Sequence, residues 1–191
     1  KLKPSASLEW GAGTGTKYFT RYIPEGARWI SVEHDEKWAN ITAEQISDPN
    51  ISIIHKGPNS EPKTGIYTCG TYTEENDGTY KDFKDYIEYP EQHAPFDFIM
   101  IDGRARCQCI VKSKELLSED GIVLLHDANR SYYHKAFEYF DKSAAFFDQR
   151  DTYGGIWIGT NSDKSLKEFI DVETYSKVWN LYNRLGKYIT V

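Results

Sequence analysis

Short apolar runs alternate with segments of helical periodicity along most of the chain. The runs at 28–33, 51–55 and 96–101 are rich in β-branched and aromatic residues and carry little charge in their interiors, as expected for strands of a buried parallel sheet. Between and after these runs, hydrophobic residues recur with a helical period. The predicted helices are 17–22, 35–46, 80–89, 107–117 and 132–140. This alternation predicts an α/β fold with a mostly parallel sheet.

The last third of the chain departs from this alternation. A fifth strand is expected at 122–125, after a turn at 118–121. Two further strands, at 145–149 and 155–159, are joined by a polar turn. The tail 163–191 carries a dense apolar stripe at helical spacing, which predicts a helical C-terminal segment.

A glycine-rich turn stands close to the N-terminus. Residues 7–15, with the sequence SLEWGAGTG, run from a short apolar strand into this turn and then into a helix. Glycine permits a sharp turn and lets a ligand approach the main chain, and the N–H groups of the following helix face the bound group. Glu33 closes the next apolar run at about the 20-residue spacing of a carboxylate that binds ribose hydroxyls. The turn and Glu33 therefore predict a site for a nucleotide-like cofactor, with an ordinary tight turn as the alternative.

Glu9 distinguishes between two classes of cofactor. A carboxylate ahead of the first glycine, Gly11, would repel the pyrophosphate of a dinucleotide. The same carboxylate would attract the ammonium group of S-adenosylmethionine (SAM). The pattern Glu-x-Gly-x-Gly-x-Gly, followed by Glu33, resembles the first two motifs of class I SAM-dependent methyltransferases. An NAD(P)-binding Rossmann oxidoreductase and a catalytically silent binding domain of a larger assembly are the alternatives.

The resemblance extends to VEHD at 32–35, IDGR at 101–104 and LHD at 125–127, and it covers residues 6 to about 160. It implies a Rossmann-like, doubly wound, mostly parallel seven-stranded sheet with an antiparallel C-terminal hairpin and helices on both faces. It implies SAM as the cofactor and S-adenosylhomocysteine as its product. The cofactor-binding residues that it implies are Glu9, Trp10, Gly11, Ala12, Gly13, Thr14, Glu33, His34, Asp102 and Gly103.

Asp102, His126 and Asp127 each follow an apolar strand and are the candidate catalytic residues. Metal-dependent O-methyltransferases of the catechol and caffeoyl type have an Asp at each of these two strand ends. The resemblance therefore makes Asp102 and Asp127 candidate ligands for Mg²⁺ or Mn²⁺, which would lower the pKa of the attacking hydroxyl. In the alternative, His126 accepts the hydroxyl proton and one of the aspartates supports it.

Arg104 and Arg106 follow Asp102 directly. Two guanidinium groups beside an acceptor site would bind a phosphate, a carboxylate or sugar hydroxyls, although solvated cations at a helix start are the alternative. Asn129 and Tyr133 complete the expected substrate site. Distant similarity to glycan-modifying O-methyltransferases makes a sugar hydroxyl the expected acceptor. A catechol- or caffeoyl-type enzyme for small molecules is the alternative.

Length and composition predict one domain over 1–191, and the resemblance implies that this is a SAM-dependent methyltransferase domain. Within it, the polar segment 57–78 is expected to be a lid-like insertion or a plain surface loop. The chain begins at Lys1 directly before the first strand, which is compatible with a domain taken from a longer chain. The sequence leaves the oligomeric state open.

The net charge of −6 argues against a nucleic acid as the partner. The three cysteines, Cys69, Cys107 and Cys109, fit free thiols in a reducing compartment better than a disulfide framework or a metal site. The sequence has neither an apolar run of membrane-spanning length nor a signal peptide. These features together predict a cytoplasmic location and no membrane span.

Overall fold

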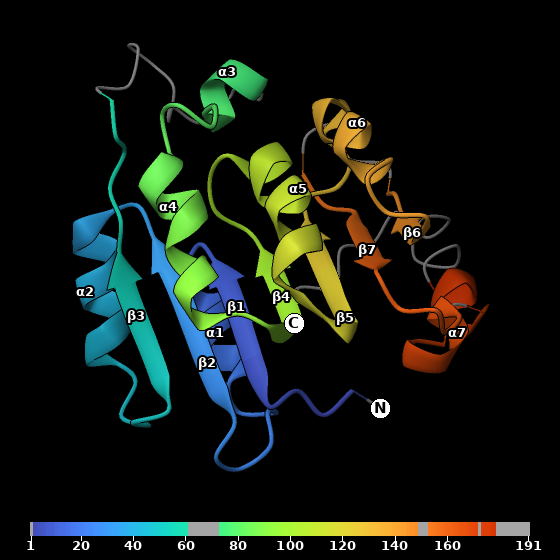
Figure 1. The fold of residues 1–191 in the computed structure, drawn as a ribbon, viewed down its shortest axis with the longest axis horizontal. Coiled ribbons are helices and arrows are strands. Elements are labelled where there is room, and N and C mark those ends of the chain that lie inside the picture. Colours follow the sequence, from blue (N-terminus) through green and yellow to red (C-terminus); the bar gives the residue numbers. More distant parts are fainter. Residues whose placement is uncertain (1, 61–72, 149–152, 172, 179–191) are drawn as a thin grey trace.

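A computed structural model describes residues 2–60, 73–148, 153–171 and 173–178 of the chain. Seven strands form one sheet in the order β3-β2-β1-β4-β5-β7-β6 (Figure 1). The strands are β1 (Ala6–Trp10), β2 (Arg28–Glu33), β3 (Ile51–His55), β4 (Phe96–Ile101), β5 (Leu117–His126), β6 (Lys142–Phe146) and β7 (Ile156–Thr160). Strands β1 to β5 pair in parallel, and β7 pairs antiparallel with β5 and β6. The predicted fold class is confirmed.

Helices lie on both faces of the sheet. The α-helices are α1 (Thr14–Phe19), α2 (Glu36–Glu44), α3 (Glu74–Asp77), α4 (Lys84–Glu88), α5 (Arg106–Leu116), α6 (His134–Phe137) and α7 (Leu166–Phe169), and the 3-10 helices are η1 (Tyr89–His93) and η2 (Ser131–Tyr133). In Figure 1, α4 and α5 cover the near face of the sheet and α1 lies behind it, while α2 flanks the edge strand β3. In the part of the chain that the structure describes, no helix is long and apolar enough to cross a membrane.

The predicted strands β2, β3 and β4 have the expected bounds, and several other bounds differ. The predicted turn 118–121 belongs to β5, because Leu117 pairs with Phe96 ahead of a register shift in β4. The C-terminal hairpin is displaced because pairing with β5 sets the register of β7, which begins at Ile156 and places Trp157 in the core. The helix after the glycine turn already begins at Thr14.

Two predicted segments fall partly outside the described residues. Of the proposed insertion 57–78, residues 61–72 are not described, and α3 forms at its end. Of the proposed helical tail, α7 and residues 173–178 are helical, and 179–191 lie outside the described residues. Cys69 also lies outside them, whereas Cys107 and Cys109 are buried, and the Cys107 thiol donates to the carbonyl of Tyr132 at 3.4 Å.

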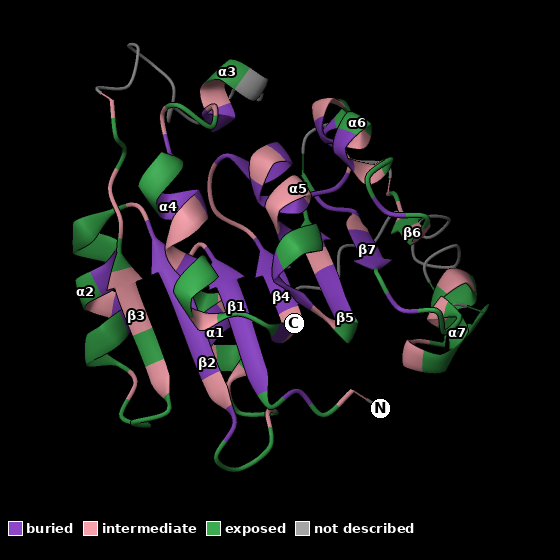
Figure 2. Cartoon of the chain, in the orientation of Figure 1, coloured by how far each residue is buried: buried purple, intermediate pink, exposed green. Residues whose placement is uncertain are grey.

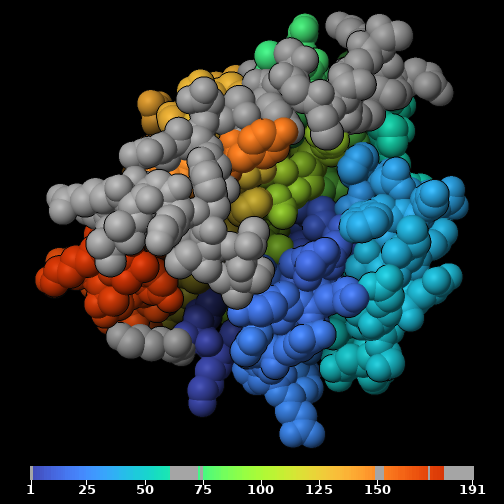
Figure 3. All heavy atoms as spheres, turned by 180° about the vertical axis from the view of Figure 1, so that it is seen from behind, coloured from blue at the N-terminus to red at the C-terminus, as the bar shows by residue number. Residues whose placement is uncertain are grey.

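Burial follows the position of each strand in the sheet. All five residues of β1 are buried, while the edge strand β3 has only partly buried and exposed residues (Figure 2). The core on the α4–α5 face packs the rings of Trp10, Phe83 and Tyr86 together with aliphatic side chains of β4 and β5. From the opposite side, Figure 3 shows the N-terminal third of the chain (blue to cyan) apart from the orange β7 region. Strands β4 and β5 lie between β1 and β7 in the sheet and therefore connect these two parts of the molecule.

The turns after β1 and β4 approach each other at Gly11 and Gly103. Gly11 has a φ of +99°, and a Cβ there would lie 2.5 Å from the Cα of Gly103. A Cβ on Gly103 would lie 2.0 Å from the Tyr86 hydroxyl oxygen and 2.9 Å from the Gly11 nitrogen. The absence of side chains at both positions lets these turns form one continuous floor.

We expect Gly11→Ala and Gly103→Ala each to destabilise the fold by about 1–3 kcal/mol, because a methyl group would collide with neighbouring backbone or with Tyr86. Gly26→Ala is the matched control, since Gly26 also has a positive φ, +76°, but has no atom within 4 Å of the added Cβ. Chemical denaturation measures the three free energies of unfolding. Equal losses for Gly26→Ala and the other two variants would contradict the close approach.

Candidate active site

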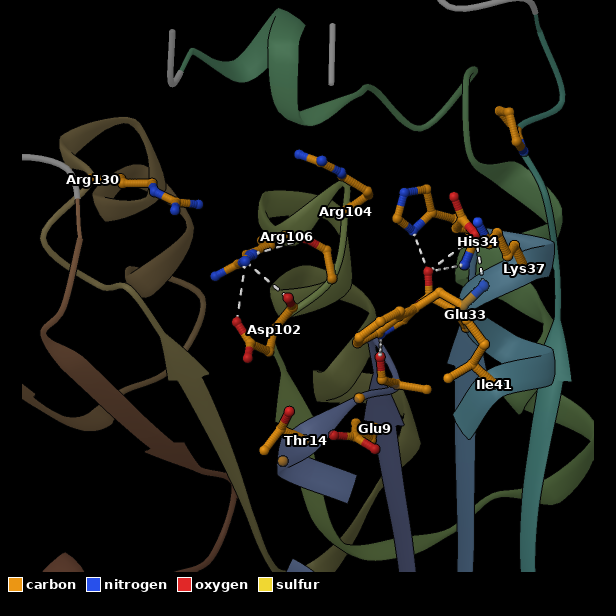
Figure 4. A pocket seen from close by; sticks show the side chains of 18 residues that line it. Glu9, Thr14, Glu33, His34, Lys37, Ile41, Asp102, Arg104, Arg106 and Arg130 are labelled. Carbon is orange, nitrogen blue, oxygen red and sulfur yellow. Dashed lines mark hydrogen bonds and ion pairs between the residues drawn. The ribbon is translucent and has the colours of Figure 1, made fainter. Parts of the chain in front are cut away.

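The carboxyl ends of the parallel strands meet at one edge of the sheet. Trp10 at the end of β1 pairs with Val32 of β2 and Ile101 of β4, and Ile101 pairs with Leu125 of β5. The residues that follow these positions therefore lie side by side. They line a cavity of about 1020 Å³ (Figure 4). Its lining comprises Glu9, Gly11, Ala12, Gly13, Thr14, Gly15, Glu33, His34, Asp35, Lys37, Trp38, Ile41, Pro58, Asp102, Gly103, Arg104, Arg106 and Arg130.

Main-chain hydrogen bonds fix the glycine turn. The N–H of Gly11 donates to the carbonyl oxygen of Val32 at 2.8 Å. The N–H of Gly13 donates to the Thr16 hydroxyl at 2.8 Å, and the indole N–H of Trp38 donates to the carbonyl of Ala12 at 2.6 Å. The turn is thus tied to both β2 and α2 and forms a pre-organised wall of the cavity.

Glu9 lies beneath this turn and is 1% exposed. Its Oε2 accepts hydrogen bonds from the hydroxyls of Thr16 and Ser31, both at 2.5 Å, and from the Trp29 indole at 3.3 Å. Its Oε1 is buried and has no hydrogen-bond partner among the residues that the structure describes. Burial raises the pKa of Glu9 to about 7, although the hydrogen bonds from Ser31, Thr16 and Trp29 act to lower it. A buried carboxylate oxygen without a partner, in a residue that lines the cavity, suits a positively charged ligand group.

Glu33 ends β2 and is held by the start of the following loop. Its Oε1 accepts hydrogen bonds from the backbone N–H groups of His34 and Asp35, both at 2.9 Å. Asp35 in turn caps α2 by accepting from the Trp38 N–H at 2.7 Å. Figure 4 shows Glu33, His34 and Lys37 together on one side of the cavity. The Glu33 carboxylate is therefore positioned before any ligand binds.

Asp102 and His126 form a hydrogen-bonded pair at the ends of β4 and β5. The Nδ1 of His126 lies 3.0 Å from Oδ1 of Asp102. This hydrogen bond, opposed by burial, raises the pKa of His126. Burial acts to raise the pKa of Asp102, but the His126 hydrogen bond and the Arg106 charge outweigh it and lower that pKa. The carboxylate thus stays ionised beside an imidazole whose side chain is half exposed.

Asp127 has a left-handed backbone conformation, with a φ of +59°, and is 7% exposed. Its Oδ2 accepts a hydrogen bond from Nη2 of Arg130 at 2.7 Å, and its Oδ1 accepts one from the N–H of Gly154 at 2.7 Å. Asp127 therefore joins the end of β5 to Arg130 and to the segment that enters β7. It does not line the cavity.

The structure places the predicted site residues in two groups. Nine of the ten expected cofactor residues line the cavity, and the exception is Trp10, whose side chain is fully buried in the core and whose indole N–H donates to the carbonyl of Tyr86. Of the expected substrate residues, Arg104 and Arg106 line the cavity. Asn129 instead binds Asp148 through its side-chain amide, and Tyr133 is fully buried with its hydroxyl accepting from Arg130.

Sequence reasoning missed Arg130 and Asp77. Arg130 lines the cavity although it lies beyond the strand end that indicated Asp127. Asp77 is buried, and its Oδ2 accepts a hydrogen bond from the N–H of Arg106 at 2.8 Å, at the start of α5. The only sequence signal for Asp77 was its place at the end of the polar segment 57–78, so its link to α5 could not be predicted.

No family model and no curated protein matches the chain, but its structure resembles many solved structures. A methyltransferase-like protein from Silicibacter pomeroyi superimposes with a TM-score of 0.54 at 17% identity, covering 87% of this chain and 84% of that one. An O-methyltransferase from Bacillus cereus, solved with S-adenosylhomocysteine, gives a TM-score of 0.53 at 16% identity and covers 83% and 74%. The chain therefore shares the fold of these methyltransferases.

The same fold also carries a different reaction. Spermidine synthase from Thermotoga maritima superimposes with a TM-score of 0.52 at 16% identity over 88% of this chain and 56% of that one. At such identities the likeness establishes the methyltransferase fold, and the reaction must be argued from the site.

The raised pKa of Glu9 makes the stability of the fold depend on pH. Between its ordinary value of 4.5 and about 7, the folded chain holds a proton that the unfolded chain has lost. The contribution is thus complete below pH 4.5, and we expect the free energy of unfolding to fall by up to about 3 kcal/mol as the pH rises to about 7.

The variant Glu9→Gln should remove this slope because an amide does not ionise. Denaturation of the ligand-free protein at a series of pH values measures it, and Glu25→Gln, at an exposed position, should keep the wild-type slope. An unchanged slope in Glu9→Gln would show that Glu9 titrates normally.

Proposed function

We propose that the chain is a SAM-dependent O-methyltransferase whose acceptor is a sugar hydroxyl. The observation that carries the proposal is one cavity lined at one end by the glycine turn and Glu33, and at the other by Asp102 and Arg104. The first end suits a nucleoside that carries an amino-acid group. Glu33 can accept hydrogen bonds from ribose hydroxyls, and the glycine turn lets a ligand approach the main chain closely. At the second end, Arg104 would orient an acceptor, and Asp102 holds His126, the candidate base, beside the cavity.

The cofactor end offers a separate contact for each part of SAM. Glu33 would accept hydrogen bonds from the ribose hydroxyls, and the Trp38 ring, fixed by its bond to Ala12, would pack against the adenine. The glycine turn and the unpartnered Oε1 of Glu9 would face the ammonium end. The cavity volume of about 1020 Å³ is large enough for SAM and part of an acceptor.

His126 acts as the general base in this proposal. When bound, SAM supplies a methyl group on a cationic sulfur, which is already a strong electrophile. With Nδ1 of His126 donating to Asp102, the Nε2 lone pair is available to take the proton of the acceptor hydroxyl. Asp102 stabilises the imidazolium that forms. Arg104, which lines the cavity on this side, would orient the sugar hydroxyls.

Cofactor choice is tested first by binding. SAM and S-adenosylhomocysteine should raise the melting temperature of the protein, and NAD should not, because only a ligand of the native state stabilises it. We expect Glu33→Gln to weaken SAM binding about 10- to 100-fold, since it loses charge-assisted hydrogen bonds to the ribose. Glu36→Gln, on the first turn of α2 and outside the cavity lining, should bind SAM normally. Stabilisation by NAD alone would support an oxidoreductase instead.

Catalysis is tested with labelled SAM and a panel of oligosaccharides. We expect His126→Gln to lower kcat at least about 100-fold while the Kd for SAM stays unchanged, because the imidazole moves the acceptor proton and does not line the cofactor cavity. His93→Gln, on η1 and outside the cavity lining, is the control and should keep the wild-type kcat. Full turnover in His126→Gln would assign the proton transfer to another group.

A further inference from the structure

Arg106 is the first residue of α5 and is 6% exposed. Its guanidinium donates three hydrogen bonds to main-chain carbonyls at the two catalytic strand ends. Its Nε donates to Gly103 at 3.0 Å, its Nη2 to Asp102 at 2.8 Å and its Nη1 to His126 at 2.8 Å. One planar group thereby fixes the end of β4 relative to the end of β5, and with it the pair Asp102–His126.

The same guanidinium lies between the two carboxylates that the sequence suggested as metal ligands. Its Nη2 is 3.2 Å from Oδ1 of Asp102, and its Nη1 is 3.6 Å from Oδ2 of Asp127. Arg130 forms a second ion pair with Asp127, at 2.7 Å. Two carboxylates are thus matched by two guanidinium groups that are themselves almost entirely buried.

This arrangement does not fit a divalent cation. Ligand atoms of Asp102, His126 and Asp127 do lie within 4.8 Å of one another, so that spacing alone would admit an ion. However, both oxygens of Asp127 already accept hydrogen bonds, and Oδ1 of Asp102 is shared by His126 and Arg106. A doubly charged ion here would lie close to two buried positive charges, where a low dielectric strengthens their repulsion.

We propose that Arg106 takes the place of the metal ion: it is the resident cation of this site and a positioning residue for the pair Asp102–His126, and methyl transfer by this chain needs no divalent metal. The inference rests on the proposed function only for its catalytic part. The claim that the site binds no divalent metal is independent of the proposed reaction, because a metal titration of the protein tests it directly.

Metal binding is tested by titrating the wild-type protein with Mn²⁺ and following free Mn²⁺ by electron paramagnetic resonance. We expect no stoichiometric binding at millimolar Mn²⁺ and no loss of methyl transfer in excess EDTA. Tight binding of one Mn²⁺ that is lost in Asp102→Asn, or an EDTA-treated enzyme that only Mg²⁺ or Mn²⁺ restores, would overturn the proposal. Because the titration and the EDTA assay use the wild-type chain, only the assignment of a bound ion to Asp102 depends on the folding of a variant.

The positioning role is tested with Arg106→Lys, which keeps a positive charge and loses the planar fork. We expect kcat to fall about 100-fold, because misplacement of the base by about 1 Å has an effect of that size, while the Kd for SAM changes less than about threefold. Arg28→Lys is the matched control: Arg28 also donates to a main-chain carbonyl, that of His93 at 2.7 Å, but lies outside the cavity lining.

The failure of this inference and the failure of the proposed function give different results. A wild-type kcat in Arg106→Lys, or a parallel loss of kcat, SAM affinity and melting temperature, would overturn the positioning role. Stoichiometric binding of Mn²⁺ by the wild-type protein would overturn the proposal that this site holds no divalent metal. It would not contradict the proposed SAM-dependent methyl transfer. Absence of SAM binding and of methyl transfer in the wild-type chain would overturn the proposed function, and the Mn²⁺ titration would still decide what occupies the space between Asp102 and Asp127.

Discussion

The contact between Gly11 and Gly103 is the constraint on which the site depends. A Cβ at Gly11 would come within 2.5 Å of Gly103, so the loops after β1 and β4 can run together only while both positions lack side chains. That approach brings Glu9 beneath the turn and Asp102 to its rim. The two parts of the cavity to which we assign the cofactor and the acceptor therefore adjoin, since residues after β1 line the first and residues after β4 line the second.

Electrostatics divides the same cavity into two regions. On the cofactor side, Glu9 and Glu33 are buried carboxylates held by hydroxyl and amide donors. On the acceptor side, the aspartates after β4 and β5 are matched by guanidinium groups of α5 and of the loop before η2. A cationic cofactor next to carboxylates that form no ion pair with a guanidinium group, and a neutral hydroxyl next to balanced ion pairs, are both favourable arrangements. The proposed reaction uses each region for the ligand whose charge suits it.

The sequence predicted the sheet well because composition alone distinguishes buried parallel strands. It also predicted the glycine turn and the polar strand ends, since those residue types have few other uses in such positions. It predicted most of the residues that line the cavity, but it could not tell which of two neighbouring strand-end side chains faces it. Neighbouring strand residues point to opposite faces, so that Glu9 lies under the turn while Trp10 packs against Tyr86 in the core. The contacts of the Arg106 guanidinium could not be predicted either, because they join carbonyls of the preceding turn, Asp102 and Gly103, to that of His126, which follows a different strand.

The antiparallel direction of β7 places its first residue, Ile156, beside His126 at the end of β5. Since β7 starts at the edge where β5 ends, the two described ends of the segment between β6 and β7 lie beside Asp127 and Asn129, which bind Gly154 and Asp148. In the sheet, β4 and β5 separate these two ends from the glycine turn after β1. In the proposed reaction, substitutions near these two ends would therefore change the choice of acceptor and leave the proposed cofactor contacts in place.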